Sequence, residues 1–160
     1  MAKPGLQPKG KTTERPVLYS FAAPGDKDRI RRLLSTCELP TLYIHKHLKS
    51  FIVAKAGKKV IGVIGLEVYG RSALVRSLCV DPAYRGRGIA RTLNAEILAY
   101  ASRWKIDRLY IFTMSAEDFA SKLGFHRIDK KQIPKSIRST WQFRACKSYP
   151  LVCMMKKITS

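Results

Sequence analysis

The segment that most constrains the fold of this chain is VDPAYRGRGIARTLNAEILAYA, which runs from Val80 to Ala101. It begins as the end of an apolar strand and passes through the turn Arg85–Gly88 into a run with helical periodicity. The apolar residues at helical spacing are Ile89, Leu93, Ile97, Tyr100, Ala101 and Trp104. Glycine disfavours helix, so two glycines beside a helix start need a physical reason. The segment predicts a strand–turn–helix unit with open backbone at the turn.

The first N–H groups of a helix have no partner within the helix, and the helix dipole favours negative charge beside them. Glycine lets a bulky anion approach these groups, and Arg85 and Arg87 add charge that can pair with phosphate. A tight strand-to-helix turn also uses glycine without any ligand. The position between an apolar strand and an amphipathic helix favours a cradle for a pyrophosphate.

The rest of the chain alternates between strand and helix patterns and shows no internal repeat. Strands are expected at 15–22, in three antiparallel runs within 51–80, at 108–114, from 124 onward and at 151–158. Helices are expected at 24–40 and 116–123, turns at 57–59 and 70–72, and a short helix or irregular segment at 134–143. This order predicts an α+β fold, a sheet with helices packed on it.

Length and composition fit one globular domain, because the chain has 160 residues and 46% of them are hydrophobic. No apolar run approaches the roughly 20 residues that a membrane-spanning helix needs. The start, MAKPGLQPKGKTTERP, lacks the apolar centre of a secretory signal. Residues 1–16 are therefore expected to form a flexible basic segment before a single domain at 17–160.

The four cysteines form no CxxC pair and show no metal-ligand spacing with the histidines. His45 and His47 are two residues apart and would share a face only on a strand, which disfavours a metal pair. The pattern indicates a reduced, cytoplasmic protein without a metal.

The chain carries 31 lysines and arginines against 11 acidic residues, which gives a formal net charge of +20. No block of five or more like charges occurs, so one interpretation is a basic surface spread over the whole molecule. The other is an anionic partner, and an anionic substrate is favoured there over RNA or a membrane. Specific nucleic-acid binding is not expected.

VDPAYRGRGIARTL resembles the coenzyme A signature of the GNAT superfamily of N-acetyltransferases. That pattern, Arg/Gln-x-x-Gly-x-Gly/Ala, falls here on Arg85, Gly88 and Ala90. AEDFASKLGF, which follows the next expected strand, resembles the second landmark of the family. The resemblance implies a mixed, mostly antiparallel twisted sheet flanked by helices, with acetyl-CoA as cosubstrate.

The same resemblance implies where acetyl-CoA would bind. The strand residues Leu78, Cys79 and Val80 would pair with its pantetheine arm. The pyrophosphate would lie on Arg85, Gly86, Arg87, Gly88, Ile89 and Ala90.

Three further stretches resemble the arsenic-resistance-linked N-acetyltransferases. They are LPT, IVAKAGKKVIGVIGLEVYGRSALVRSLCVDPAYRGRG and IPKSIRSTWQF. Those enzymes acetylate the amino group of glutamate mimics such as phosphinothricin and arsinothricin, and N-acetylglutamate synthase domains share parts of the pattern. The resemblance implies a small anionic amine as acceptor.

Acetyl transfer to an amine needs a group that removes the ammonium proton. Glu67 is the only acid in the apolar run 60–69, so its carboxylate could accept that proton directly or through water. If Gly70 and Ala73 close a two-residue hairpin, Glu67 lies directly opposite Arg76, and a cross-strand ion pair explains both residues without catalysis. Both interpretations stay open at this point, and they are compatible.

Arg76 interrupts an apolar strand, and together with Arg71 it could hold a carboxylate or phosphinate of the acceptor. The alternative places Arg71 in a solvated turn. Arg138 and Thr140 are weaker candidates for closing the acceptor pocket. The tyrosine with which the family protonates the thiolate falls on Ala120, so the general acid is not identified.

The sequence as a whole predicts an acetyl-CoA-dependent N-acetyltransferase for a small anionic amino acid or a glutamate-like antimetabolite. One alternative is acetylation of a protein N-terminus or lysine, and another is a non-catalytic acetyl-CoA-binding module. A homodimer is compatible with these predictions.

Overall fold

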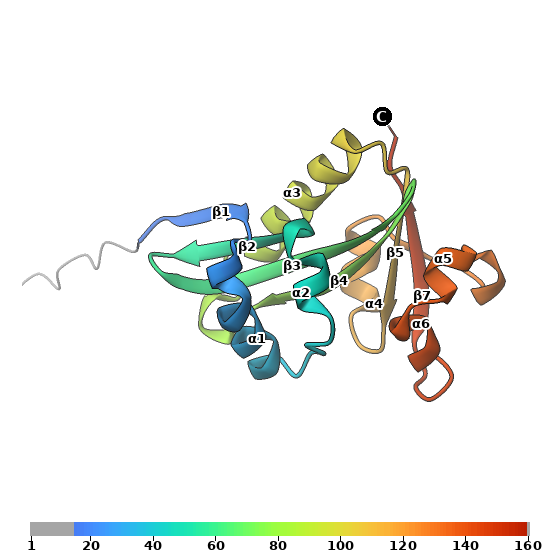
Figure 1. Cartoon of the computed structure of the whole chain (residues 1–160), viewed down its shortest axis with the longest axis horizontal. Coiled ribbons are helices and arrows are strands. Elements are labelled where there is room, and N and C mark those ends of the chain that lie inside the picture. Colours follow the sequence, from blue (N-terminus) through green and yellow to red (C-terminus); the bar gives the residue numbers. More distant parts are fainter. Residues whose placement is uncertain (1–14, 160) are drawn as a thin grey trace, which may run out of the picture.

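The computed structural model describes residues 15–159 of the chain (Figure 1). The expected flexible segment 1–16 lies outside these residues apart from its last two positions. The strands are β1 (Val17–Phe21), β2 (Phe51–Ala56), β3 (Lys59–Tyr69), β4 (Ser72–Val80), β5 (Arg108–Thr113), β6 (His126–Arg127) and β7 (Val152–Lys157). The α-helices are α1 (Lys27–Thr36), α2 (Ile44–His47), α3 (Ile89–Arg103), α4 (Glu117–Lys122), α5 (Lys135–Arg138) and α6 (Trp141–Ala145). Short 3-10 turns lie at Pro24–Asp26, Leu48–Ser50, Pro82–Tyr84 and Lys130–Gln132.

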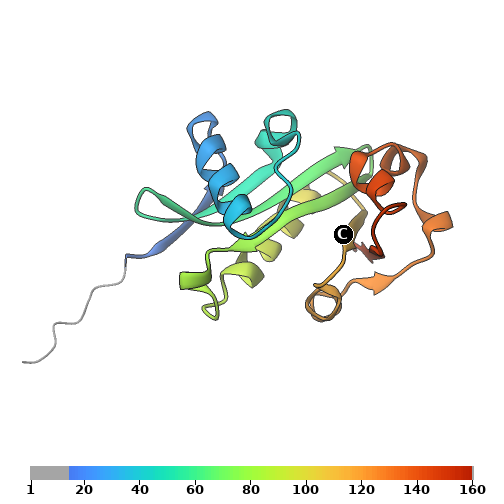
Figure 2. The same ribbon diagram turned by 90° about the horizontal axis from the view of Figure 1, so that it is seen from below.

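The strands form one seven-stranded sheet in the order β1-β2-β3-β4-β5-β7-β6. Neighbouring strands are antiparallel except β4 and β5, which are parallel. Helices α1 and α2 cover one face, α3 and α4 cover the other, and α5 and α6 lie at the β7 end (Figures 1 and 2). The predicted mixed, mostly antiparallel sheet flanked by helices is confirmed.

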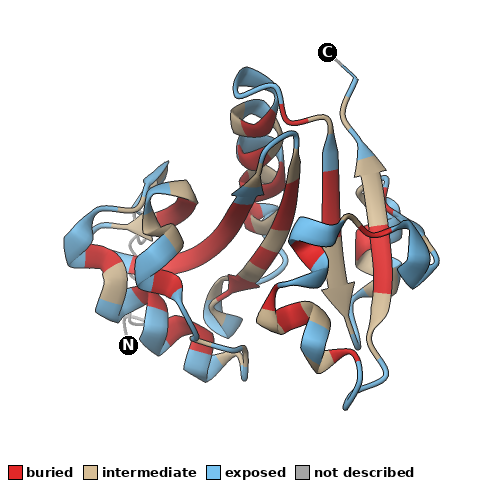
Figure 3. Ribbon diagram, turned by 45° about the vertical axis from the view of Figure 1, so that its right-hand side comes forward, coloured by how far each residue is buried: buried red, intermediate tan, exposed pale blue. Residues whose placement is uncertain are grey.

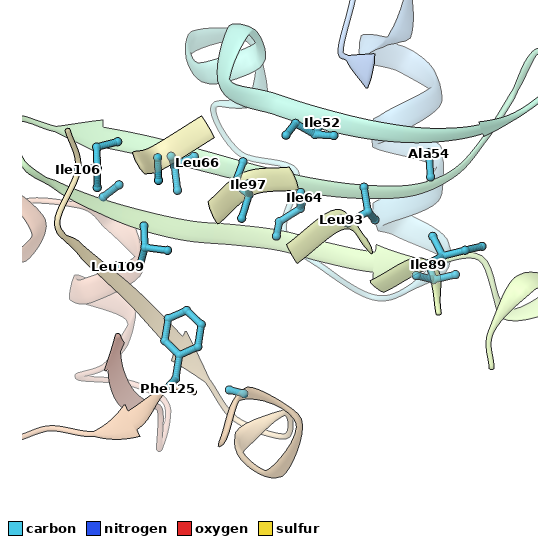
Figure 4. Close-up of a cluster of buried hydrophobic side chains, with 14 of the residues drawn as sticks. Ile52, Ala54, Ile64, Leu66, Ile89, Leu93, Ile97, Ile106, Leu109 and Phe125 are labelled. Atoms are coloured by element: carbon cyan, nitrogen blue, oxygen red, sulfur yellow. The ribbon is translucent and has the colours of Figure 1, made fainter. Parts of the chain in front are cut away.

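The largest core cluster lies between the sheet and α3. Helix α3 places Ile89, Leu93 and Ile97 against strand residues such as Ile64 and Leu66 (Figure 4). Burial is concentrated along the central strands and the inward sides of the helices (Figure 3). A second cluster packs under α1 and α2, and a third packs between the sheet and α5–α6.

One expectation for α3 is wrong. Trp104 was expected on its buried face, but the helix ends at Arg103 and the Trp104 side chain is exposed. The chain leaves the helical path at Lys105, whose φ is 58°. The tryptophan instead lies beside Tyr100, with ring centroids 6.2 Å apart.

Strands β4 and β5 part early, and this parting positions the candidate site. Their pairing runs only from Ser72↔Arg108 to Leu74↔Tyr110, although β4 continues to Val80. Beyond that point β4 carries a bulge, because Val63 pairs with Cys79 while Gly65 pairs with Arg76, which places two β4 residues opposite Ile64. Because the pairing with β5 ends at Leu74, the β4 backbone beyond that residue has no β5 partner.

Residues 15–159 contain neither a candidate membrane span nor a candidate metal site. No helix there is long and apolar enough to cross a membrane. The same part of the chain contains no group of three or more His, Cys, Asp or Glu side chains placed to hold a metal ion.

Candidate functional site

The turn between β4 and α3, residues 85–90, is called the glycine turn below. Gly86 and Gly88 have φ values of 77° and 80°, in the left-handed region that glycine adopts without strain. A Cβ added to either glycine would meet no atom within 4 Å, so open space lies beside this backbone. Gly88 is the N-cap of α3, and the unpaired N–H groups of the first helical turn follow it. The backbone of the glycine turn is thus accessible to an anion.

The two arginines of the glycine turn are exposed and fold back onto the turn. Arg85 donates from Nε to the carbonyl of Val80 at 3.1 Å. Arg87 donates to the carbonyl of Ala83 at 3.5 Å, and its guanidinium lies over the Tyr84 ring at 5.1 Å. These contacts hold the turn in shape and keep positive charge at its opening.

The β4 residues that lead into the glycine turn alternate between the two faces of the sheet. Leu78 and Val80 pack in the α3 cluster, whereas Cys79 packs in the cluster under α1. Burial raises the pKa of the Cys79 thiol well above its usual range. Cys79 therefore contributes backbone and apolar surface here, and its thiol is not a nucleophile at neutral pH.

Glu67 is the centre of the polar site on the α1–α2 face, and its side chain is only 3% exposed. Tyr69 donates its hydroxyl to Oε1 at 3.0 Å, and His47 Nε2 lies 3.0 Å from the same oxygen. Arg76 donates from Nη1 to Oε2 at 3.4 Å, and Gln142 donates from Nε2 to that oxygen. We call these five residues the Glu67 cluster.

The partners of Glu67 decide its charge. Burial alone raises the pKa of the carboxyl, but the hydrogen bonds from His47 and Tyr69 and the charge of Arg76 outweigh burial and lower it. Burial and the neighbouring carboxylate also raise the pKa of Tyr69 far above its usual range, so its hydroxyl stays a donor. At neutral pH the site therefore contains a firmly ionised carboxylate, which is a weak acceptor for a further proton.

The hairpin register differs from the sequence expectation. The turn residues are Gly70 and Arg71, so Tyr69 pairs with Ser72, Glu67 faces Leu74 and Arg76 faces Gly65. The expectation that Glu67 lies directly opposite Arg76 is wrong. It assumed that Gly70 pairs with Ala73, whereas the hairpin closes with Tyr69 paired to Ser72. The shift of two residues keeps both side chains on one face, and the ion pair forms diagonally.

Arg76 contacts two aromatic rings in addition to its ion pair. Its guanidinium is 5.8 Å from the centroid of Phe51 and 5.7 Å from that of Trp141. The opposite residue, Gly65, makes room for this stack, because a Cβ there would lie 2.4 Å from the Phe51 ring. Arg76 also donates from Nε to Ser77 Oγ at 3.0 Å, and its side chain is 6% exposed. The guanidinium is held in one orientation.

The other three residues expected to bind the acceptor lie outside the Glu67 cluster. The Arg71 side chain is 77% exposed in the hairpin turn and pairs with Asp107 at 2.9 Å. Arg138 donates to the carbonyls of Ile133 and Lys131, both at 2.7 Å. Both arginines brace loops instead of facing Glu67.

Thr140 caps α6. Its hydroxyl donates to the carbonyl of Ile137 at 2.7 Å and accepts from the N–H of Phe143 at 3.2 Å. The expected segment 134–143 does reach the site, but through the next two residues, Trp141 and Gln142. Trp141 Nε1 and Gln142 Oε1 are buried and have no hydrogen-bond partner within residues 15–159.

His47, Tyr69, Trp141 and Gln142 were missed by the sequence reasoning. His47 lies on the four-residue helix α2, whose packing on β3 leaves no periodic pattern in the sequence. Ala120, where the family's tyrosine would fall, is buried against the α3 cluster.

Comparison with known proteins identifies the family. Residues 19–125 match the profile of the Acetyltransferase (GNAT) family. An uncharacterized N-acetyltransferase of Chlorobaculum tepidum is 29% identical over 108 residues, which are 67% of this chain and 66% of that protein. The N-alpha-acetyltransferase RimI of Mycobacterium tuberculosis is 38% identical over 92 residues, which are 52% of this chain and 54% of that protein. The chain thus spans between about half and two thirds of the length of these relatives.

Solved structures show the same fold. N-acetylglutamate synthase from Neisseria gonorrhoeae, complexed with coenzyme A and N-acetyl-glutamate, matches 92% of this chain with a TM-score of 0.81 at 18% identity. The match covers 36% of that longer chain. A Mycobacterium tuberculosis protein in complex with CoA matches 89% of this chain and 99% of its own length, with a TM-score of 0.70 at 22% identity.

Proposed function

The chain belongs to the GNAT family of acetyltransferases, and we propose that it transfers the acetyl group of acetyl-CoA to the amino group of a small anionic amino acid or glutamate-like antimetabolite. The observation that carries the choice of acceptor is the Glu67 cluster. It joins a buried, oriented arginine to an acid–imidazole pair in an enclosed site on the α1–α2 face.

The glycine turn and β4 are the parts that would hold acetyl-CoA. The N–H groups at the start of α3, with Arg85 and Arg87 beside them, fit its pyrophosphate. The β4 backbone beyond Leu74, which β5 leaves unpaired, fits an extended amide-bearing arm. When bound, acetyl-CoA supplies the activated acetyl thioester.

The enclosure of the Glu67 cluster favours a small acceptor. His47 approaches Glu67 from α2, and Gln142 approaches the same carboxylate from α6. Helices α2 and α6 thus both contact the Glu67 side chain. A polypeptide acceptor would instead need an open groove at this position. A single amino acid would need only a few polar partners, such as Arg76 and the two unpartnered groups on Trp141 and Gln142.

Arg76 supports an anionic acceptor. Its bonds to Ser77 and Glu67 use Nε and Nη1, which leaves the Nη2 donors for a carboxylate or phosphinate. The contacts with two aromatic rings help to hold the guanidinium in place, so an acidic group would bind in a defined orientation. A carboxylate held there would fix the α-amino group of an amino acid a few bonds away and so limit the orientations in which it can react.

The test is thiol release from acetyl-CoA against a matched panel of acceptors. The panel contains glutamate, aspartate and phosphinothricin, neutral amino acids such as leucine, and short peptides with a free N-terminus or a lysine. We expect turnover with acidic amino acids or phosphinothricin. For leucine, kcat/KM should be at least tenfold lower, because leucine lacks the acidic group and loses one charged two-point contact. Exclusive turnover of peptides would overturn the small-acceptor proposal. Acetyl-CoA binding without turnover of any acceptor would indicate a binding module.

A second candidate function is N-terminal acetylation of proteins. The similarity to RimI favours it, and that protein is an N-alpha-acetyltransferase. The peptide arm of the panel decides between the two, since a peptide acceptor requires α6 to move away from Glu67.

A further inference from the structure

We propose that His47 is the proton acceptor of the acetyl transfer and that Glu67 is its positioning residue. This inference rests on the proposed N-acetyltransferase function. The sequence suggests the Glu67 carboxylate as the base, whereas this inference assigns that role to a histidine. His47 lies 20 residues away along the chain, and helix α2 brings it to Glu67.

The contact between the two side chains fixes which ring nitrogen carries the proton. His47 Nε2 lies 3.0 Å from Glu67 Oε1, and the carboxylate is ionised. An ionised carboxylate only accepts hydrogen bonds, so Nε2 must carry a hydrogen. In the neutral imidazole the lone pair then lies on Nδ1, on the side of the ring away from Glu67. Within residues 15–159, Nδ1 has no hydrogen-bond partner.

Exposure separates the roles of the two residues. The His47 side chain is 25% exposed, whereas the Glu67 side chain is 3% exposed and enclosed by four donors. An incoming ammonium group can reach the imidazole, but it cannot reach the carboxylate without displacing Tyr69, Arg76 or Gln142. His47 is therefore the member of the pair that meets the acceptor.

The charged groups around His47 come from three elements. From β3 it faces Glu67, and the neutral hydroxyl of Tyr69 lies behind that carboxylate. From β4, Arg76 pairs with the same carboxylate. His45 and Lys46 on α2 are exposed side chains. Glu67 is thus the charged group in direct contact with the imidazole.

The proton transfer balances without any further reagent. An N–H bond of the acceptor ammonium breaks, an N–H bond forms at Nδ1, and the electron pair stays on the acceptor nitrogen as the free amine. The imidazolium returns its proton to solvent when the cycle ends, so one proton is released for each acetyl group transferred.

The first test compares the pH dependence of kcat/KM in wild type, His47→Gln and a control, His45→Gln, with the best acceptor of the panel. We expect His47→Gln to lose about 100-fold in kcat/KM, the usual contribution of a general base. With His47 as the acceptor of the ammonium proton, the reactive state has a neutral His47 and a protonated acceptor amine, so the wild-type rate should level off below the pKa of the acceptor ammonium. In His47→Gln the amine must first lose its proton to solvent, so the acid limb should continue up to that pKa, and added imidazole should restore part of the rate to His47→Ala. An acid limb that ends at the same pH in wild type and His47→Gln, or a loss of the same size in His45→Gln, overturns the assignment.

The second test does not depend on turnover. Nitrogen-15 NMR of the protein labelled at its three histidines distinguishes protonated from bare ring nitrogens, and the His45→Gln and His47→Gln variants assign the signals. We expect neutral His47 to carry its hydrogen on Nε2 in wild type and to become a tautomer mixture in Glu67→Gln. A neutral His47 protonated on Nδ1 would refute the proton-acceptor role even if the enzyme is active. The expected tautomer with no turnover of any acceptor would locate the failure in the proposed function instead.

Discussion

In the glycine turn the groups that would bind a ligand are consecutive backbone N–H groups, whereas in the Glu67 cluster they are side chains from four elements. The turn is exposed and its geometry depends on two glycines with positive φ. The cluster is buried, and its contact from Gln142 to Glu67 joins residues 75 positions apart. One region is therefore specified locally, and the other depends on the whole fold being in place.

This difference predicts two kinds of sensitivity to substitution. A change in the glycine turn should remove a ligand and leave the fold intact, because little packs on the turn. A change in the Glu67 cluster should affect stability and acceptor use together, because the same contacts do both. The following substitutions test that contrast, from the largest expected effect to the smallest.

Gly88→Val should reduce acetyl-CoA affinity by on the order of 100-fold or more. The valine adds about 1–2 kcal/mol of strain at φ 80° and covers N–H groups whose bonds to phosphate are each worth about 1.5–3 kcal/mol. Calorimetric titration with acetyl-CoA measures the loss, and circular dichroism checks the fold.

The control for Gly88→Val is Gly70→Val. Gly70 also has a positive φ, 64°, and open space beside it, but it lies in the β3–β4 hairpin. It should show similar strain with acetyl-CoA affinity unchanged. Equal loss of affinity in both variants would mean that strain alone explains the result, and the glycine turn would lose its assigned role.

Glu67→Gln should destabilise the protein by about 3 kcal/mol at neutral pH, because Arg76 is then buried without a countercharge. The carboxyl pKa is lowered in the folded state, so this stabilisation is fully present above the ordinary pKa of 4.5 and is lost as pH falls through the lower folded value. Urea unfolding from pH 7 to pH 3 should therefore show the two proteins converging in acid.

Glu96→Gln provides the matched loss of one negative charge. Glu96 is exposed on α3. Its substitution should change stability by less than about 0.5 kcal/mol at every pH. A constant gap between wild type and Glu67→Gln down to pH 3 would contradict the buried ion pair.

The fold was largely predictable because its main features are local. The strand–turn–helix from Val80 to Ala101 carries both a hydrophobic period and a glycine pattern, and the three central strands are separated by turn residues. Helix ends were less predictable, as Trp104 shows, because a pattern can continue past the point where the chain turns away.

The Glu67 cluster was only half predictable. Glu67 and Arg76 stand out because each interrupts an apolar strand, and a buried charge needs a partner. His47 and Gln142 do not stand out, because their role depends on how short helices pack on distant strands. Arg138 was a weaker candidate for closing the acceptor pocket, and the structure directs its guanidinium to two backbone carbonyls.

Arg76→Lys should raise the KM for the acidic acceptor about tenfold and leave acetyl-CoA affinity unchanged. Lysine keeps the positive charge but lacks the planar guanidinium that contacts Phe51 and Trp141 and leaves its Nη2 donors for a carboxylate. Steady-state kinetics and calorimetry separate the two effects, with Arg144→Lys on α6 as an exposed control. An unchanged KM would show that Arg76 serves only as the partner of Glu67.

Thr140→Val should destabilise the protein by about 1 kcal/mol without a change in acceptor KM. The valine keeps the shape of the side chain but leaves the N–H of Phe143 without its cap. Ser139→Ala, at an exposed hydroxyl that bonds the carbonyl of Lys135, should have a smaller effect. A rise in KM with unchanged stability would return Thr140 to the acceptor site.

Arg71→Ala should have the smallest effect, at most about 0.5 kcal/mol in stability and none in acceptor KM. Its pair with Asp107 is exposed, and such pairs contribute little because water screens them and both side chains lose freedom. A double-mutant cycle with Asp107→Ala measures the pair directly. Arg31→Ala on α1 removes one positive charge at another exposed position, and so controls for the general attraction of an anion to a chain of net charge +20. If Arg71→Ala alone raised the acceptor KM severalfold, the acceptor would have to extend from the Glu67 cluster to the hairpin turn, and the enclosed small-molecule site would give way to a longer, more open one.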